Sequence, residues 1–167
     1  ADLSQYGISS ANNGSGTTDS AEFEFPPVAL TAGQFVYATS DSAGFADFFG
    51  FDADLIDKSM NINGDDAIEL FHMGSVIDVF GDVNVDGTGE PWDHVDGWAY
   101  SKNTRFLGST FNDAEWRYSG TNAFEGEISN TFATIPFPVG SYSPSLGGTD
   151  VTLTGTDALG NSSDCVA

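Results

Sequence analysis

Oxygen-bearing side chains recur at nearly every second position of one acidic stretch, residues 82–93. Positions 1, 3, 5, 9 and 12 of this stretch carry carboxylate or amide oxygens, and Gly87 stands at position 6. In calcium loops of the EF-hand type, alternate side chains point inward, a glycine permits the sharp turn, and position 7 contributes its carbonyl. The predicted calcium ligands are Asp82, Asn84, Asp86, Thr88, Glu90 and Asp93.

Three features of this stretch favour a different interpretation. It follows a predicted strand instead of a helix, Asp93 replaces the longer Glu at position 12, and Pro91 restricts the exit. In the alternative, the stretch is a solvated connection in which Asp and Asn side chains cap turn amides. Calcium is therefore a hypothesis, to which Asp96 adds a further candidate ligand. The pair Asp65–Asp66, after Asn63–Gly64, is expected to hold turn backbone instead of a cation.

Residues suited to catalysis are scarce. The two histidines are His72, in a predicted hairpin turn, and His94, in the acidic region. No Gly-x-Ser-x-Gly nucleophile elbow occurs, and phosphate chemistry needs a glycine loop with a lysine, or clustered carboxylates with a histidine. The basic side chains available to hold phosphate are Lys58, Lys102, Arg105 and Arg117. We therefore expect this chain to have no enzymatic activity of its own.

The charge balance excludes further classes of function. Four Lys and Arg residues stand against 25 Asp and Glu, which gives a formal net charge of -21 over 167 residues. Such a chain repels nucleic-acid phosphates and anionic membranes, because phosphate binding requires clustered Lys and Arg. Disorder is not expected, since 40% of the residues are hydrophobic and 13% are aromatic. We predict a folded protein without direct nucleic-acid contact.

The sequence also bears on membranes and cysteine chemistry. No stretch approaches the roughly 20 apolar residues that span a bilayer. The first residues, Ala1–Leu3, lack the basic and apolar regions of a signal peptide, which fits either a cytosolic protein or an already processed one. The single cysteine, Cys165, has no partner within the chain, so it is either an exposed thiol or pairs with another chain.

The elements that position these residues are predicted to be short antiparallel strands. Hydrophobic residues follow period two and are interrupted every eight to twelve residues by Gly, Asn, Asp or Pro, as in a sandwich or barrel. A hairpin is expected around the turn His72–Ser75. The predicted strands are Leu3–Ile8, Ala21–Phe25, Gln34–Thr39, Ala67–Phe71, Val76–Phe80, Gly97–Tyr100, Glu115–Ser119 and Asp150–Thr154.

One short helix interrupts this pattern, near residues 43–50. Phe45, Phe48 and Phe49 stand at i, i+3 and i+4, the spacing of an apolar helix face. We expect these rings to pack in the core instead of binding a cofactor. The chain as a whole divides into a β-rich unit over residues 1–142 and a linker with a terminal strand and tail over residues 143–167.

Several strings in the chain share the pattern of one known family. They are Asn61–Phe71 (NINGDDAIELF), Gly74–Asp82 (GSVIDVFGD) followed by Trp92, and the shorter Asp2–Ile8 and Asp96–Tyr100. Together they resemble the lamin-tail domain of secreted bacterial proteins, and more narrowly the lamin-tail module near the front of large extracellular nucleases of the endonuclease/exonuclease/phosphatase superfamily. The resemblance covers about residues 2–142. It implies an all-β, immunoglobulin-like antiparallel β-sandwich, an extracellular or cell-surface location, and an accessory role.

Two departures from the family pattern are present. The strand pair that precedes the Asp-Leu-Ser element in the family is absent before Asp2, so the opening strands are missing. An incomplete sandwich exposes a sheet edge, which proteins avoid. Three explanations stay open: the sequence is a fragment, the terminal strand near Val151–Thr154 fills the gap, or a neighbouring copy donates a strand. The tail after Tyr142 resembles a connection to a following domain.

These observations predict a non-catalytic interaction or scaffold module of a secreted bacterial protein, with calcium as a stabilising ion if the acidic stretch binds it. Its partner is expected to be another protein or neighbouring copies of the chain. One alternative is a self-assembling extracellular filament subunit that exchanges strands between copies. Another is a fragment of a secreted nuclease whose catalytic domain lies outside this chain. A further alternative to core packing is a surface on which a sugar or polymer stacks, formed by Trp92, Trp98 and Trp116 with Tyr100 and Tyr118.

Overall fold

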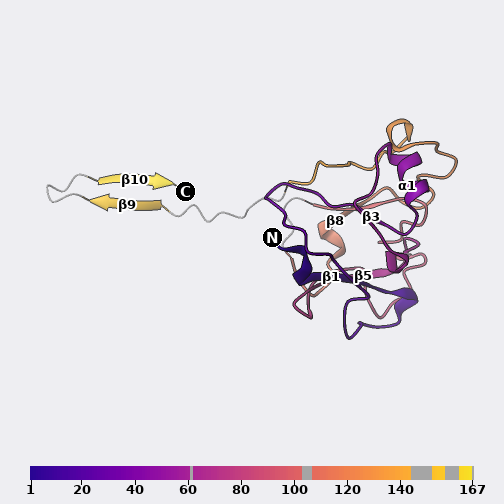
Figure 1. The fold of residues 1–167 in the computed structure, drawn as a ribbon, viewed down its shortest axis with the longest axis horizontal. Coiled ribbons are helices and arrows are strands. Elements are labelled where there is room, and N and C mark those ends of the chain that lie inside the picture. Colours follow the sequence, from indigo (N-terminus) through magenta and orange to yellow (C-terminus); the bar gives the residue numbers. More distant parts are fainter. Residues whose placement is uncertain (61, 103–106, 144–151, 157–161, 167) are drawn as a thin grey trace.

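The computed structural model describes residues 1–60, 62–102 and 107–143, together with two later strands at 152–156 and 162–166 (Figure 1). These residues form short strands, mostly in antiparallel pairs, and a single α-helix. Short 3-10 turns lie at Leu3–Gln5, Asn12–Gly14, Lys58–Met60, Asp113–Glu115 and Asn130–Phe132. The predicted all-β class is thereby confirmed.

The largest sheet has four antiparallel strands in the order β2-β1-β5-β6. The hairpin predicted around residues 72–75 is present, and Met73 and Gly74 in its turn have φ values of 50° and 78°. Positive φ at both central residues is typical of a tight hairpin turn. Ile8 pairs with Leu70, so the first residues of the chain join the sheet beside that hairpin. The four strands are β1 (Tyr6–Ala11), β2 (Phe23–Glu24), β5 (Ala67–His72) and β6 (Ser75–Phe80).

One face of β5 is buried but not wholly apolar. Ala67, Glu69 and Phe71 point to this face and are at most 3% exposed, while the residues between them are half-buried. A carboxylate at the centre of this face requires hydrogen-bond donors. Thr17 and Thr18, about fifty residues earlier in the chain, supply them to Glu69. Part of the buried layer is therefore polar.

Three further strand pairs accompany the main sheet. β3 (Ala38–Thr39) runs parallel to β4 (Leu55–Ile56), and β7 (Ala99–Ser101) runs antiparallel to β8 (Trp116–Tyr118). β9 (Thr152–Thr156) pairs antiparallel with β10 (Ser162–Val166). The strand predicted near Val151–Thr154 therefore has β10 as its ladder partner among the described strands, and it does not extend the main sheet.

Several strands are shorter than the alternation predicts. The prediction of a strand over Leu3–Ile8 was wrong at its start, because the Asp2 carboxylate accepts a hydrogen bond from the Ser4 amide (3.0 Å) and caps a 3-10 turn. The predicted strands at residues 21–25 and 34–39 contract to the two-residue β2 and β3. Pro26–Pro27 has no N–H to donate to a ladder, so β2 cannot continue through it.

The helix α1 (Ser42–Phe49) confirms the prediction near residues 43–50. Its first turn is capped by the Asp41 carboxylate, which accepts from the Gly44 amide at 3.1 Å. Its end is set by Gly50, which has a φ of 80°, a left-handed conformation that glycine adopts without steric cost. The rings of Phe45 and Phe49 pack together with their centroids 4.7 Å apart, as the helical spacing requires.

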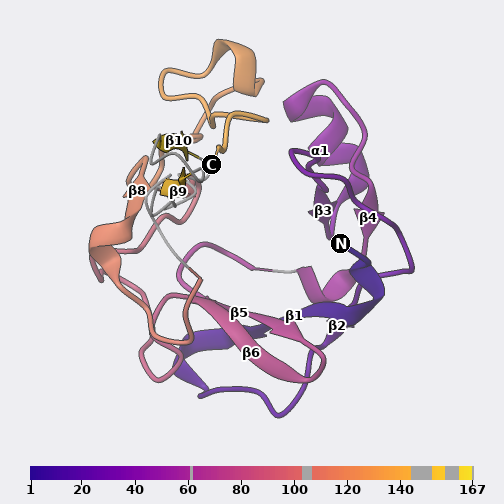
Figure 2. The ribbon, with the colours of Figure 1, turned by 90° about the vertical axis from the view of Figure 1, so that its left-hand side faces the viewer.

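Figure 2 shows the main sheet at the bottom, with α1, β3 and β4 above one end and β8 above the other. Aromatic contacts connect α1 to the later chain: the Phe48 and Phe124 centroids are 4.8 Å apart, and those of Phe49 and Phe137 are 6.3 Å apart. Among the described residues, the strands above the main sheet form two-stranded pairs. An immunoglobulin-like sandwich needs two extended sheets packed face to face, so it stays a prediction.

Phe80 is central to the core. Its side chain is 6% exposed, and its ring lies 5.8 Å from Trp92 and 4.8 Å from Trp116, measured between centroids. Trp92 is itself 4% exposed, and Trp98 and Trp116 are half-buried. The tryptophans therefore pack against other rings, which favours the core interpretation over a sugar-stacking surface.

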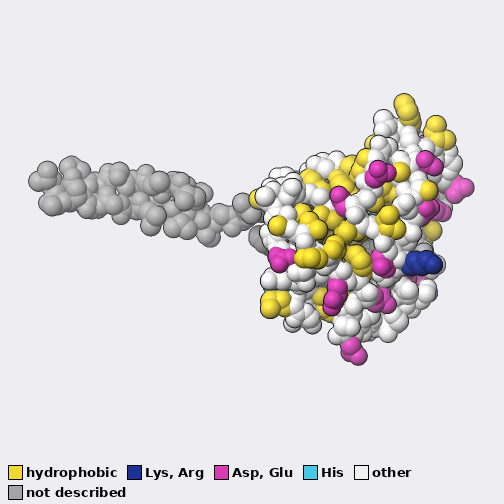
Figure 3. All heavy atoms as spheres, in the orientation of Figure 1, with side chains coloured by type: hydrophobic (Ala, Val, Ile, Leu, Met, Phe, Trp, Pro, Cys, Tyr) yellow, Lys and Arg dark blue, Asp and Glu magenta, His cyan; other side chains and the backbone are white. Residues whose placement is uncertain are grey.

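Even the most buried of the large side chains keep some exposure to solvent. Among the described residues, none of them falls below 2% exposure. Figure 3 shows apolar side chains gathered over the middle of the face in view, with acidic groups scattered around them.

Across the described part of the chain, no helix has the length and apolar character that a membrane crossing requires.

The capping of α1 provides a test of this fold. Replacing Asp41 by Ala leaves the Gly44 amide without its acceptor, so we expect a loss of about 1 kcal/mol in the free energy of unfolding, measured by urea denaturation. Asp47→Ala is the matched control, because Asp47 is exposed in the same helix and is not at its N-cap. Equal losses in the two variants would contradict the assigned helix start.

Candidate functional site

The acidic stretch 82–93 is a succession of capped turns. Oδ1 of Asp82 accepts from the Asn84 amide at 2.9 Å, and Oδ1 of Asp86 accepts from the Thr88 amide at 3.0 Å. Asp93 accepts from two amides, those of Gly89 at 2.8 Å and Val95 at 3.1 Å. The Thr88 amide is the main cause that lowers the pKa of Asp86. At least one oxygen of each of these carboxylates is therefore used by the local backbone.

Asp65 lies beneath this stretch and holds it to the sheet. Its carbonyl accepts from the Gly87 amide at 3.1 Å, and its Oδ2 accepts from the Thr88 hydroxyl at 2.8 Å. The residue is 7% exposed, and its Oδ1 has no hydrogen-bond partner within the described part of the chain. Gly87 is required here, because a Cβ at this position would lie 2.5 Å from the Asp65 carbonyl oxygen.

Asp66 plays the part predicted for the Asp65–Asp66 pair. Its carboxylate accepts from the Asn13 amide at 3.0 Å and from the Asn63 amide at 3.4 Å. The first of these bonds joins the turn after β1 to the start of β5. Asp66 is 4% exposed, so these bonds offset the cost of burying its charge.

Of the six predicted calcium ligands, Asp82, Asn84, Asp86, Thr88 and Glu90 are exposed and Asp93 is half-buried. Asp82 and Asn84 also border a cavity with residues from elsewhere in the chain. Among the described residues, no three His, Cys, Asp or Glu side chains form a group suited to a metal ion. The turn-capping role that we considered as the alternative is present, and calcium stays a prediction.

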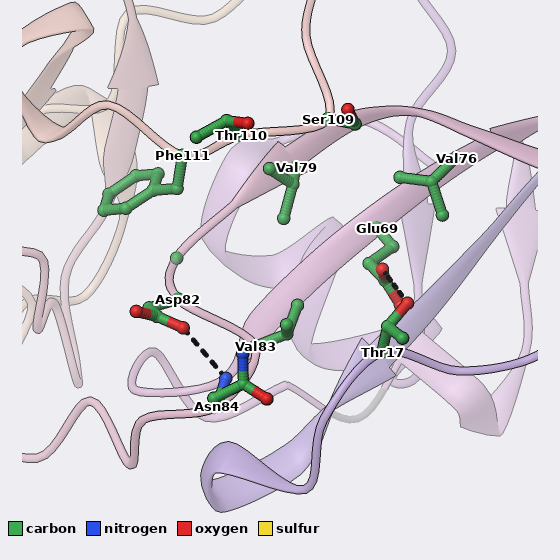
Figure 4. A pocket seen from close by; sticks show the side chains of 11 residues that line it. Thr17, Glu69, Val76, Val79, Asp82, Val83, Asn84, Ser109, Thr110 and Phe111 are labelled. Atoms are coloured by element: carbon green, nitrogen blue, oxygen red, sulfur yellow. Dashed lines mark hydrogen bonds between the residues drawn. The ribbon is translucent and has the colours of Figure 1, made fainter.

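The cavity beside Asp82 has a volume of about 410 Å³ (Figure 4). Glu69 and Thr17 line one side of it, and Asp82 and Asn84 line the other. The side chains of Val76, Val79 and Phe111 and the residues Ser109 and Thr110 complete the wall. The sequence pattern did not single out Glu69 or Thr17, and the only signal was a glutamate at a position where the strand alternation expects burial.

His94 borders a smaller, mostly apolar cavity of about 240 Å³ between β5, β6 and Trp116. Its ring centroid lies 5.3 Å from that of Phe80, and its Nδ1 lies 3.1 Å from the Trp92 carbonyl oxygen. Burial is the main cause that lowers the pKa of His94, and it outweighs the opposing effects of the Trp92 carbonyl and nearby carboxylates. The folded protein therefore favours the neutral imidazole.

A second candidate surface is the loop of residues 127–137, here called the apolar loop. Ile128 is 82% exposed and Phe132 is 76% exposed. The Glu127 carboxylate closes the loop by accepting from both the amide and the hydroxyl of Thr134, each at 2.8 Å. These bonds lower the pKa of Glu127. The apolar loop thus presents two large apolar side chains on a braced backbone.

Two further side chains fix the same loop: Asn130, which lies in it, and Trp98, which lies earlier in the chain. The Asn130 side chain donates to the Phe137 carbonyl at 3.0 Å and accepts from the Phe137 amide at 2.7 Å. The Trp98 indole donates to the Ile135 carbonyl at 3.0 Å. The sequence pattern missed this surface, because the run to residue 134 carries no clear periodicity.

Comparison of the chain with protein-family models, with curated proteins and with solved structures found no match. The resemblance to the lamin-tail domain therefore rests on the sequence strings alone and stays a prediction.

The calcium hypothesis is tested by thermal unfolding in EDTA and in 2 mM calcium, a concentration on the order of that needed by extracellular calcium modules. It predicts a calcium-dependent rise in Tm that is smaller in Asp86→Asn, because Asn keeps the cap on the Thr88 amide but lacks the charge. Asp19→Asn, an exposed site outside the stretch, controls for general screening of negative charge. Equal rises in the two variants, or no rise in the unmodified protein, would leave the stretch with its capping role only.

The lowered pKa of His94 predicts a dependence of stability on pH. The unfolded chain takes up a proton near the ordinary pKa of about 6.5, before the folded protein does, so stability falls as pH decreases through that value. Urea denaturation between pH 7.5 and 5.5, on the order of one pH unit either side of the unperturbed pKa, measures the effect. We expect a smaller decline for His94→Gln. A steeper decline in that variant would contradict the assigned burial.

Proposed function

We propose that this chain is a non-catalytic interaction module that docks on a protein partner through the apolar loop. The observation that carries the proposal is the pairing of a braced backbone with two large exposed apolar side chains, Ile128 and Phe132. A loop that is already ordered loses less conformational entropy on binding than a flexible one. Binding of Ile128 and Phe132 in a pocket on a partner therefore costs less ordering of the loop backbone.

The density of exposed apolar residues supports docking at this loop. Isolated exposed apolar residues are normal on protein surfaces and need no functional explanation. Here Ile128, Phe132 and Ile135 account for three of the eight large apolar residues that are exposed in the described chain, within a span of eight positions. Large apolar anchors at the centre of an interface commonly supply most of its binding energy.

The wider setting of the module is proposed from the sequence. The lamin-tail resemblance supports an immunoglobulin-like sandwich in a secreted bacterial protein, at or near the cell surface. The net charge of -21 disfavours direct binding to nucleic acid. A place within a secreted nuclease, whose catalytic domain lies elsewhere, fits the same resemblance. Hydrolysis of DNA by the repurified chain, in magnesium or calcium, would contradict the non-catalytic assignment.

Site-specific photo-crosslinking on the source cells tests the docking surface. A photoreactive residue at position 128 or 132 should yield one and the same crosslinked product, identified by mass spectrometry. Position 56 is the matched control, because Ile56 is 61% exposed and lies outside the apolar loop. Absence of a product from 128 and 132, or equal products from all three positions, would contradict docking at the loop. A product of twice the chain's mass would identify the partner as a second copy.

A second candidate function, assembly of copies by strand exchange, is favoured by the pairing of β9 and β10. These strands form their own two-stranded sheet, with no ladder to another described strand. An isolated two-stranded hairpin is marginally stable in water, so additional strand pairing would stabilise it. Within the described residues, the main sheet ends at β2 and β6, and a sheet edge can accept a strand from another chain.

Light scattering distinguishes this second function from docking by the apolar loop. If copies exchange strands, the full chain forms large particles, and deletion of residues 150–167 abolishes them while the rest of the chain keeps its fold. The circular dichroism spectrum in the aromatic region reports on that fold. A full chain that stays monodisperse and monomeric up to the highest soluble concentration would exclude assembly by strand exchange.

A further inference from the structure

The cavity of about 410 Å³ beside β6 has the size of a small-molecule site, and the proposed docking function does not use it. Small-molecule sites in proteins fall between about 300 and 1,000 Å³ and combine an apolar wall with a few placed polar groups. Here residues from four separate parts of the chain meet: Thr17, Glu69 in β5, the turn 81–84 after β6, and the segment 109–111 (Figure 4).

The polar side of this cavity is built around a buried carboxylate. Glu69 is 3% exposed; its Oε1 accepts from the Thr17 hydroxyl, and its Oε2 accepts from the Thr18 amide at 2.9 Å. The Thr18 hydroxyl lies 3.3 Å from the same Oε2 and 3.1 Å from the Ser20 carbonyl oxygen. A carboxylate has about four acceptor positions, so these bonds leave capacity for a ligand. The Thr17 hydroxyl donates to Glu69, which leaves the oxygen of Thr17 able to accept from a ligand.

The opposite side of the cavity adds exposed polar groups near an apolar wall. Asp82 and Asn84 lie across from Glu69, and the rim carries the exposed residues Ser109 and Thr110. The apolar part of the wall is formed by two valines of β6 and a phenylalanine, namely Val76, Val79 and Phe111. The lining therefore offers many hydrogen-bond acceptors, several hydroxyls and one aromatic ring.

The described lining disfavours an anionic ligand and does not form a divalent-cation site. None of the described residues that form it is Lys, Arg or His, so the described lining offers an anionic ligand no cationic partner. The two carboxylates do not converge on a shared point: Asp82 is bonded to the Asn84 amide at 2.9 Å, and Glu69 is turned to the threonines (Figure 4). A divalent cation needs converging oxygens, which this arrangement lacks.

From these observations we infer that the cavity binds a neutral saccharide. The ring hydroxyls of a sugar donate to the Glu69, Asp82 and Asn84 oxygens, and its C–H face packs on the Phe111 ring and the β6 valines. Such a site is independent of the apolar loop, which lies on a different part of the chain. The inference can therefore fail while the docking function stands.

The test is an amide-resolved NMR titration of the full chain with glucose, galactose, N-acetylglucosamine, cellobiose and lactose as separate probes. We expect at least one sugar to shift the signals of Glu69, Asn84 and Phe111 in a saturable way. Val76→Phe fills the cavity and should abolish these shifts. The matched control Val28→Phe, at an exposed site away from the lining, should retain them.

Three results would overturn the assignment. The first is the absence of a saturable shift with every sugar. The second is a sugar-induced shift that persists in Val76→Phe, which would place binding elsewhere. The third is a stronger effect of calcium or of the amine spermidine on the same signals, which would assign the cavity to a cation. The amide spectrum of each variant shows directly that the variant is folded.

Discussion

Hydrogen bonds from amide and hydroxyl groups to carboxylates are the interaction on which the described structure depends. The chain has 25 acidic residues and only four basic ones, so few carboxylates can be neutralised by a cationic side chain. Asp66 instead binds the amides of Asn13 and Asn63, and Glu69 binds Thr17 and Thr18. Hydrogen bonds to a charged group contribute about 1.5–3 kcal/mol each, more than bonds between neutral groups. The bonds from Asn13, Thr17 and Thr18 join residues 13–18 to Asp66 and to β5 across more than fifty positions of sequence.

The same interaction shapes both surfaces to which we assign a function. In the apolar loop, Glu127 accepts from Thr134 and thereby fixes the backbone that presents Ile128 and Phe132. In the cavity, Glu69 is held by the threonines and Asp82 by the turn that follows β6. Acidic side chains therefore act here mainly as internal braces. The surfaces left for recognition are apolar at the loop and rich in hydroxyls and acceptors at the cavity.

Local patterns in the sequence predicted the local elements well. The hairpin β5–β6 and the helix α1 follow from alternation, from turn residues and from the spacing of Phe45, Phe48 and Phe49, all of which act between near neighbours. Strand lengths were less predictable, because β2 and β3 are bounded by capped turns and prolines that compete with the ladder. The immunoglobulin-like sandwich expected from the lamin-tail resemblance stays a prediction, because the described strands outside the main sheet form two-stranded pairs.

The two proposed surfaces could not be predicted because they depend on residues that are distant in the sequence. The alternation of β5 places Glu69 on the buried face, but it does not reveal that Thr17 and Thr18 lie beside the carboxylate and donate to it. The stretch 82–93 has the spacing of a calcium loop, yet spacing alone does not reveal whether the oxygens turn to an ion or to the backbone. In the same way, Ile128 and Phe132 have no periodic pattern, and the bonds between Asn130 and Phe137 that close their loop cannot be read from one.

Native-state hydrogen exchange of the Asn13 and Thr18 amides tests most directly whether carboxylates brace this fold. Both amides lie outside regular strands, and their acceptors are the carboxylates of Asp66 and Glu69. We expect both amides to be protected to a degree comparable with the amides of β5, because opening them requires the buried acids to lose their donors. Exchange as fast as that of the exposed turn at residues 32–33 would contradict it.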